Sequence, residues 1–325
     1  MKLHRREFLR LAKSAAALPA VSGVAWAQSY PVRPVRIVVG FAPGGATDIV
    51  ARLIGQWLSD RLGKPFVVEN RTGAGGNIAT ETVARSAADG YTLLVAGQQD
   101  AVNASLYTKL NFDFIRDFAP IATLVSQPLV LVVNPSVPAN TLPEFIAYAK
   151  ANPGKINVAS AGNGTPPHLA AELFKMMAAV DITHIPYRGG APAITDLLGG
   201  RVEALFVSEL LSIEHIKTGK LRPLGVTSAV RLESLPAVPT VAEFLAGYET
   251  SFWAGIVAPR NTPADIINIL NREINAALSD PKIKMRFAEI GGLVLGGSPT
   301  DFQKLLADET EKWKKVITFA GIKPD

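Results

Sequence analysis

Short apolar runs rich in β-branched residues alternate with helical patterns along this chain, and this alternation constrains the fold more than any other feature. The runs show little polar alternation, as buried strands do, and they are Val35–Val39, Tyr91–Ala96, Leu129–Val133, Ile182–Ile185, Ala204–Val207 and Gly255–Ala258. Strand–helix–strand alternation of this kind predicts a mostly parallel sheet with helices on both faces. The predicted fold class is therefore α/β.

Helices are predicted between several of these strands. After Thr47, the apolar residues from Ile49 to Leu62 recur at helical spacing and form one stripe. Start and stop signals predict three more helices, two of which follow capping-box patterns at Thr141–Glu144 and Thr262–Asp265, while the third runs from Pro192 to Gly199–Gly200.

The first 27 residues have the parts of an export signal. The segment Lys2–Arg10 is basic, Leu11–Ala27 is apolar, and Ala25-Trp26-Ala27 is a small-residue cleavage pattern. We predict cleavage after Ala27 and a periplasmic location for the mature protein. The hexapeptide Arg5-Arg6-Glu7-Phe8-Leu9-Arg10 resembles the twin-arginine pattern, and a plain Sec signal is the alternative.

Charge and composition exclude several classes of function. The formal net charge is +5, but the leader contributes +4 of it, which leaves about +1 for the rest of the chain. We therefore expect no basic nucleic-acid groove and no nucleic-acid partner. The chain has no cysteine, which excludes disulfides, thiolate nucleophiles and cysteine-ligated metal sites. Beyond the leader no segment has about 18 consecutive apolar residues, so we expect a soluble mature protein.

Cleavage after Ala27 would leave 298 of the 325 residues, a length at which an α/β protein should divide into two lobes. We expect the chain to cross between them near Ser126–Pro128 and near Tyr248–Phe252. The predicted domains are residues 1–27 as signal peptide, residues 28–126 with 253–325 as lobe 1, and residues 127–252 as lobe 2. A monomer is the expected oligomeric state.

Three glycine-rich loops lie where a strand is expected to end and a helix to begin, and they are Gly40–Gly45, Asn70–Asn77 and Ser160–Pro167. Ligands of open α/β sheets bind at this edge. Free N–H groups at a helix start carry partial positive charge and attract anions. Two such termini facing each other across a cleft could therefore clamp a carboxylate without arginine. A set of tight turns with helix caps is the alternative interpretation.

These loops do not match nucleotide-binding or catalytic patterns. The loop Phe41–Gly45 lacks the Lys and Ser/Thr of a P-loop, and Gly73–Ile78 lacks the third glycine of the dinucleotide fingerprint. The chain has no His-Glu-x-x-His motif and no Gly-x-Ser-x-Gly elbow. We therefore predict no cofactor, no metal and no catalytic residue.

Two residues beside the loops have open interpretations. Asp48, in the first turn of the first helix, either complements the helix dipole or accepts a hydrogen bond from a ligand. His168, at the start of the helix after the third loop, either has a capping or cleft-facing role or contacts the ligand. His184 lies in an apolar strand and is expected to be structural. The aromatic pair Phe252-Trp253 is expected to pack in the core or at a hinge, with lining of the cleft as the alternative.

At these loops the sequence resembles the solute-binding receptors of tripartite tricarboxylate transporters, the Bug-type extracytoplasmic receptors. The resemblance covers nearly the whole mature chain. It is carried, in order, by Ile37–Arg52, Gly63–Ile78, Asp89–Leu94, Gly162–Ala170, His184–Ala193, Asp196–Val202 and Val238–Glu243.

This resemblance implies a two-lobed Venus-flytrap fold of the periplasmic-binding-protein type, which holds a ligand carboxylate mainly by backbone amides and small hydroxyls. The ligand-binding residues that it implies are Phe41, Ala42, Pro43, Gly44, Gly45, Asp48 and Gly76 on lobe 1, and Ser160, Gly162, Thr165, His168, Tyr187 and Ser208 on lobe 2. Ala79 and Gln98 belong to the same predicted site but depart from the family pattern. Relatives often have Gly in place of Ala79 and a small residue such as Thr or Ser in place of Gln98. The larger amide side chain of Gln98 is expected to narrow the pocket or to add hydrogen bonds.

The resemblance further implies a periplasmic receptor that captures a carboxylate-bearing organic acid and delivers it to a membrane permease of the tripartite type. Two alternatives stay open, namely a receptor that reports its ligand to a signalling partner and an enzyme that acts on a carboxylic acid. The lack of a base–nucleophile constellation argues against the enzyme, and no enzymatic activity is predicted.

Overall fold

The computed structural model describes residues 30–107 and 109–323, so the predicted export signal, residues 1–27, lies outside the described residues. The described strands form one sheet of ten strands, in the order β2-β1-β3-β9-β4-β7-β5-β6, with β8 and β10 also paired to β4. The strands are β1 (Val35–Val39), β2 (Phe66–Asn70), β3 (Thr92–Gly97), β4 (Phe118–Val133), β5 (Asn157–Ser160), β6 (Thr183–Pro186), β7 (Ala204–Ser208), β8 (Arg222–Val226), β9 (Ser251–Pro259) and β10 (Leu293–Gly296).

Helices follow most of the strands. They are α2 (Ala46–Leu62), α3 (Asn77–Ala84), α4 (Gln98–Leu106), α5 (Leu142–Ala151), α6 (Pro166–Ala178), α7 (Gly190–Leu198), α8 (Glu209–Lys217), α9 (Ala264–Ser279), α10 (Pro281–Glu289) and α11 (Pro299–Ala320), with short 3₁₀ turns at Ala74–Gly76 and Val241–Glu243. The predicted α/β class is confirmed, and each predicted strand coincides with or overlaps an observed one.

The two ends of the sheet are parallel and its middle is antiparallel. At one end β1 pairs in parallel with β2 and β3, and at the other β5 pairs in parallel with β6 and β7. Between them, β4 and β9 run antiparallel to each other and to their neighbours. The sheet is therefore mixed and not mostly parallel as predicted, because β4 and β9 cross between its two ends in opposite directions. Each parallel end has its own crossover helices.

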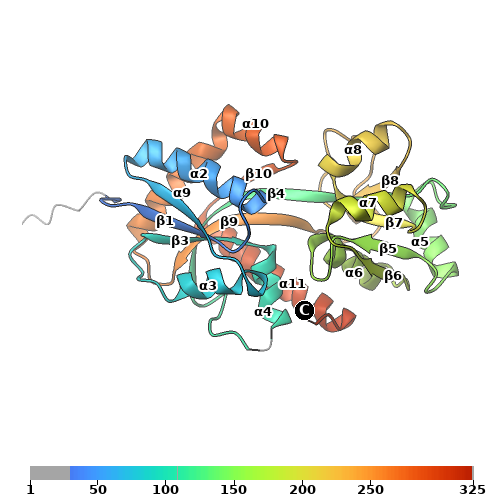
Figure 1. The fold of residues 1–325 in the computed structure, drawn as a ribbon, viewed down its shortest axis with the longest axis horizontal. Coiled ribbons are helices and arrows are strands. Elements are labelled where there is room, and N and C mark those ends of the chain that lie inside the picture. The colour runs from blue at the N-terminus through green and yellow to red at the C-terminus, as the bar shows by residue number, and fades with distance from the viewer. Residues whose placement is uncertain (1–29, 108, 324–325) are drawn as a thin grey trace, which may run out of the picture.

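The strand β4 connects the two ends. Its first part pairs with β9, from Phe118 opposite Pro259 to Pro128 opposite Ser251. From Leu129 onward it pairs instead with β7 and β8. Figure 1 shows β4 and β9 running between two groups of elements, with α2, α9 and α10 in one group and α5, α6, α7 and α8 in the other.

Three apolar clusters hold these layers together. One covers a face of the β1–β3 end, where Ile37, Ile54 and Leu270 are fully buried. A second covers one face of the other end, around Leu197 and Leu205. The third runs along the opposite face of both ends and includes α11, which also contacts α6. The C-terminal helix thus packs against both groups of elements.

One of the two predicted capping boxes marks a capped helix start, and the other does not. The hydroxyl of Thr141 accepts a hydrogen bond from the Glu144 amide at 3.4 Å, which confirms a side-chain cap at the start of α5. The capping box predicted at Thr262–Asp265 is wrong. The Thr262 hydroxyl donates instead to the carbonyl of Pro259 at 2.8 Å, and α9 begins at Ala264 with Pro263 as its N-cap. Within the described residues, no helix is both long and apolar enough to cross a bilayer.

Candidate functional site

Two cavities open between the two groups of elements. The first, which we call the distal cavity, has a volume of about 270 Å³ and joins Ala46 in the first turn of α2 to Pro166 and Ser208 of the other group, with Gln127 and Phe252 from the connecting strands. The second, which we call the outer cavity, has a volume of about 360 Å³. It is lined from one side by Phe41, Ala74 and Gln99 and from the other by Asn163 and Gly164.

The predicted residues of the first loop lie between the two groups of elements, beside the two cavities. Phe41, Ala42, Pro43, Gly44 and Gly45 are all exposed, and Gly45 is the N-cap of α2. Because α2 starts here, the N–H groups of its first turn have no acceptor within the helix. Ala46 from that turn lines the distal cavity. The first loop therefore presents a helix N-terminus to the space between the two groups.

Asp48 fixes the shape of the first loop. Its Oδ2 accepts hydrogen bonds from the Gly44 amide and from Arg52 Nε, both at 2.9 Å, and its Oδ1 accepts one from Asn70 Nδ2 at 2.8 Å. The same Asn70 nitrogen donates to the carbonyl of Phe41 at 2.9 Å. Burial alone would raise the pKa of Asp48, but these donors outweigh it and lower the pKa to about 2. Both carboxylate oxygens are thus occupied by protein donors.

The second loop packs directly beneath the first. A Cβ on Gly40 would lie 2.9 Å from the Gly76 Cα. A larger residue at Gly40 would therefore force the first and second loops apart. The ring of Phe41 lies over Gly76, 3.6 Å from where a Cβ would be. Ala79, one turn into α3, is fully buried in the core and faces Gly40. Its side chain is therefore part of the packing under the loops and does not face either cavity.

The first residues of α3 and α4, Asn77 and Gln98, have buried side-chain amides, and one polar atom of each has no partner among the described residues. Gln98, 1% exposed, donates from Nε2 to the Thr250 hydroxyl at 3.3 Å, while its Oε1 has no partner among the described residues. Asn77 accepts a hydrogen bond from Asn103 Nδ2 at 2.9 Å, and its own Nδ2 likewise has none within the described chain. Buried polar groups of this kind are uncommon because each costs about 1–3 kcal/mol.

The third loop is held by a cluster around Ser160. This residue is fully buried, and its Oγ lies 2.6 Å from His184 Nε2 and accepts a hydrogen bond from the Gly162 amide at 3.0 Å. The Thr165 hydroxyl donates to the Gly162 carbonyl at 2.7 Å. Gly162 has φ +131, a conformation that side chains rarely adopt. Serine, threonine and glycine thus shape the loop through contacts with one another.

His168 and His184 stack behind this loop. Their ring centroids are 3.7 Å apart and their planes differ by 10°. His168 is buried, and its Nδ1 accepts a hydrogen bond from the Gly164 amide at 3.0 Å. Burial and the neighbouring His168 lower the pKa of His184 to about 4, against a smaller opposing effect of Glu172. The contacts of His168 are therefore with the loop backbone, and His184 is satisfied by Ser160, in agreement with its predicted structural role.

The remaining predicted residues lie on the same side of the gap. Tyr187 donates from its hydroxyl to Asp196 Oδ2 at 2.8 Å, and its own amide donates to the Ser160 carbonyl at 3.0 Å. Ser208 is the N-cap of α8 and lines the distal cavity. Gln127 was not predicted, and Phe252 was predicted to line the cleft only as an alternative to core or hinge packing. The two residues lie opposite each other in the β4–β9 pairing and line the same cavity. Their only signal was their place next to the predicted crossovers.

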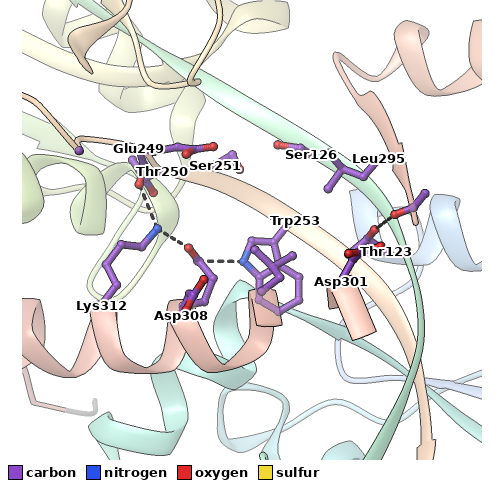
Figure 2. Close-up of a pocket in the computed structure, with 14 residues that line it drawn as sticks. Thr123, Ser126, Glu249, Thr250, Ser251, Trp253, Leu295, Asp301, Asp308 and Lys312 are labelled. Carbon is purple, nitrogen blue, oxygen red and sulfur yellow. Dashed lines mark hydrogen bonds and ion pairs between the residues drawn. The ribbon is translucent and has the colours of Figure 1, made fainter. Parts of the chain in front are cut away.

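A further pocket of about 470 Å³ lies at the junction of β4, β9 and α11 (Figure 2). The carboxylate of Glu309 accepts hydrogen bonds from Trp253 Nε1 and Trp313 Nε1, both at 2.9 Å, and pairs with Lys312. Lys312 also donates to the Glu249 carbonyl at 3.0 Å. None of the predicted ligand-binding residues lines this pocket. Trp253 therefore packs in the core between β9 and α11, whereas its neighbour Phe252 lines the distal cavity.

The structure thus brings the three loops to one gap and leaves Ala79 outside it. Among residues 30–107 and 109–323, no group of three or more histidine and acidic side chains is placed to hold a metal ion.

Comparison with known proteins identifies relatives across almost the whole chain. The model of the tripartite tricarboxylate transporter family receptor matches residues 50–322. The protein BugT of Bordetella pertussis is 41% identical over 302 residues, which are 91% of this chain and 92% of that protein.

Solved structures show the same fold. R. palustris Rpa4515 with adipate is 38% identical with a TM-score of 0.73, over 91% of this chain and all (100%) of that one. A TctC solute-binding protein from Polaromonas, with no ligand, is 29% identical with a TM-score of 0.80, over 89% of this chain and 99% of that one. The two-lobed periplasmic-binding-protein fold is thereby confirmed.

Proposed function

The chain belongs to the tripartite tricarboxylate transporter receptor family, and from that premise we propose that it captures a small organic acid between two lobes and delivers it to a membrane permease of the tripartite type. It is a solute-binding receptor by family and not an enzyme. The adipate in the R. palustris relative supports a carboxylic acid as the kind of ligand.

The two lobes are residues 28–126 with 253–325, and residues 127–252. The pairing of β4 supports this division, because its partners change from β9 and β10 to β7 and β8 between Pro128 and Leu129. The return crossing is supported by Thr250, whose amide donates to the Thr227 carbonyl in the second group at 3.0 Å just before β9 begins. Rotation about these two segments would close the lobes on a ligand.

One observation carries the proposed binding mode. The first turn of α2 opens into the distal cavity, whose opposite wall belongs to the other lobe. The amides of Ala46 and Thr47 in this turn would hold the ligand carboxylate, helped by the helix dipole. The loop residues Phe41–Gly45 and Gly76 would surround it, and Ser208, which lines this cavity, would face it from the other lobe. The side-chain polar atoms of five other predicted residues are already engaged by the protein, so these residues would position the loops without touching the ligand; they are Asp48, Ser160, Thr165, His168 and Tyr187.

The proposed location is the periplasm, reached through a leader that is cleaved after Ala27. The basic, apolar and small-residue parts of the leader support this proposal. Amino-terminal sequencing of the protein recovered from the periplasm should begin at Gln28. Replacement of Arg5 and Arg6 by Lys should block export if the twin-arginine route is used and should leave export intact on the Sec route.

The binding function is tested by a thermal-shift screen of the purified protein against a library of carboxylic acids. A ligand at 100 times its Kd should raise the free energy of unfolding by about 2.7 kcal/mol. Two variants locate the site. Gly44 has φ +85 and its amide donates to Asp48, so Gly44→Pro should destroy the first loop. Gly162→Val should destroy the third.

The matched control is Gly63→Pro. Gly63 also has positive φ, +70, and its amide also donates a hydrogen bond, but it ends α2 at the opposite end from the cleft. Folded Gly44→Pro and Gly162→Val proteins that bind the acid as wild type does would refute the proposed site. Loss of binding in Gly63→Pro as well would show that the effect is not specific to the loops.

A further inference from the structure

We propose that the part of the ligand beyond its clamped carboxylate is uncharged and apolar, so that this receptor prefers monocarboxylic acids with a ring or alkyl chain over dicarboxylic acids. The inference rests on the proposed function, because it assigns the chemistry of the remainder of the same ligand. It starts from the distal cavity, which adjoins the first turn of α2 and would receive whatever extends from the carboxylate.

The walls of the distal cavity are mostly apolar. Leu129, Phe206, Leu211 and Phe252 are among the residues that line it, Gln127 and Ser208 are its polar members, and none of the described residues in the lining is charged. Leu211 remains 43% exposed at its rim. Such an exposed apolar surface gains stability when an apolar group or the closing lobe covers it. A carboxylate in the same place would lose its water without gaining a cation.

Helix α6 starts at the distal cavity but lacks two of the amide donors that could bind a second carboxylate. Helix α6 points its N-terminus at the distal cavity, but its first two residues are Pro166 and Pro167, and both line the cavity. Proline has no amide N–H. Two of the donors that a helix start would normally offer an anion are therefore replaced by ring carbons.

Two neighbouring helix starts bring no cation to the cavity. Helix α7 begins at Gly190, which lines the cavity, and helix α8 begins after Ser208 with the acidic residue Glu209. Among the described residues that line the two cavities, the one cation is Lys323, which lines the outer cavity and not the distal one. A second carboxylate in the distal cavity would thus meet mostly apolar groups and no cationic side chain.

The size of the distal cavity fits a ring or a chain of similar bulk. A dry cavity of about 150 Å³ binds benzene in another protein, and the distal cavity measures about 270 Å³. The chemical class that fits is therefore an aromatic or aliphatic monocarboxylate.

Two matched pairs of acids test this inference by calorimetric titration of the purified protein. Hexanoate and adipate have the same six-carbon chain, and benzoate and terephthalate share the same ring. In each pair only the second acid has a further carboxylate. We expect hexanoate and benzoate to bind at least about tenfold more tightly than their partners, because burial of an unpaired carboxylate is costly. Acetate should bind more weakly than hexanoate, because it leaves the distal cavity unfilled.

A variant supplies the missing cation. Leu211→Lys should narrow or reverse the preference within each pair by giving the second carboxylate a partner. Leu210→Lys is the matched control, because Leu210 is the adjacent residue, is 60% exposed and does not line the cavity. It should leave the preference as in wild type. An equal effect of both variants would mean that a nearby charge, and not the lining of the cavity, sets the preference, and would overturn the inference.

The outcomes separate this inference from the proposed function. Tighter binding of adipate and terephthalate to the wild-type protein would overturn the inference and leave the proposed function standing. Binding of none of the four acids, with binding of another acid from the library, would do the same. A protein that binds no carboxylic acid at all would overturn both.

Discussion

At the scale of single residues, Asp48 shows how a carboxylate can serve an anion-binding loop without contacting the anion. Its two oxygens receive three protein donors from Gly44, Arg52 and Asn70. These contacts join the first loop, helix α2 and strand β2 into one unit. Preorganisation of this kind reduces the ordering that ligand binding would otherwise require. Asp48 had two open interpretations in the sequence because spacing alone cannot show which donors reach a carboxylate.

Asp48→Asn is predicted to weaken both stability and ligand binding. An amide at this position can accept fewer hydrogen bonds and places its own NH₂ against a donor, which should lower the free energy of unfolding by about 1–3 kcal/mol. Urea unfolding measures this loss. The control is Asp60→Asn on the exposed side of the same helix, where the Asp60 Oδ1 accepts one hydrogen bond from Gln56 at 2.8 Å. Equal stability of the two variants would contradict the role assigned to Asp48.

Asp48 also predicts that the free energy of unfolding depends on pH in the acid range. The pKa of Asp48 is lowered from 3.8 to about 2 in the folded state. The corresponding stability is therefore present above the unfolded pKa of about 4 and is lost as the pH falls toward 2. It should amount to roughly 1–2 kcal/mol after solvent screening. In Asp48→Asn this part of the acid dependence should be missing.

His184 predicts a second, milder pH dependence. Burial and the stacked His168 lower its pKa from 6.5 to about 4, so the folded protein keeps it neutral while the unfolded chain takes up a proton below about pH 6.5. Stability should therefore be full above that pH and fall as the pH drops toward 4, by at most about 2 kcal/mol between pH 7.5 and 5. Denaturant titrations at these two values should show a smaller change in His184→Gln. An unchanged slope would show that His184 does not titrate as inferred.

At the scale of elements, helix α11 contacts the proposed hinge, the segment just before and at the start of β9, through one buried carboxylate. Glu309 accepts hydrogen bonds from Trp253 on β9 and from Trp313 on its own helix, and it pairs with Lys312. Because Lys312 also holds the Glu249 carbonyl, this cluster fixes the segment through which the chain returns from the second lobe. The pocket in Figure 2 therefore lies beside the proposed hinge.

Glu309→Ala is predicted to destabilise the protein by about 3–5 kcal/mol, because it leaves two buried indole N–H groups without their acceptor and the half-buried Lys312 without its ion-pair partner. Chemical denaturation measures this change. Glu311→Ala on the same helix is the control, since Glu311 is exposed and makes only a surface ion pair with Lys315 at 3.5 Å. Its effect should be within about 1 kcal/mol. Comparable losses in both variants would mean that helix propensity, not the hinge cluster, was measured.

The sequence predicted elements best where their apolar pattern was continuous. Strands β1 and β7 were predicted almost to the residue, since both are mostly apolar and mostly buried, with Arg36 as the one exposed residue of the two strands. The first half of β4 was missed because Pro120 and polar residues interrupt it, although register shifts in its pairing with β9 accommodate that stretch. The capping box at Thr262 failed because its hydroxyl found a backbone carbonyl nearby, which a local pattern does not show.

The loops of the site could be predicted, but their partners could not. Glycine content and position located all three loops at the edge of the sheet. The burial of Ala79 and the contact between Gln98 and Thr250 depend on residues far away in the chain. The loss of donors at Pro166 and Pro167 is visible in the sequence, yet it gains meaning only once α6 is seen to face the distal cavity.

At the scale of the whole molecule, the proposed cycle requires the two lobes to close. Both cavities have walls from both lobes, so a ligand there can favour the closed state by the difference in its contacts. Small-angle scattering should show a smaller radius of gyration once a bound acid saturates the protein, and an unchanged radius would contradict closure.

The central claim is that backbone amides at the start of α2 hold the carboxylate of an acid enclosed by both lobes. A crystal structure with the tightest acid from the screen tests it most directly. We predict a carboxylate oxygen within hydrogen-bond distance of the Ala46 or Thr47 amide, the rest of the molecule against Phe252 and Leu211, and the second lobe closed over it. An acid bound in the hinge pocket beside Glu309, or held by side-chain cations away from α2, would contradict the account.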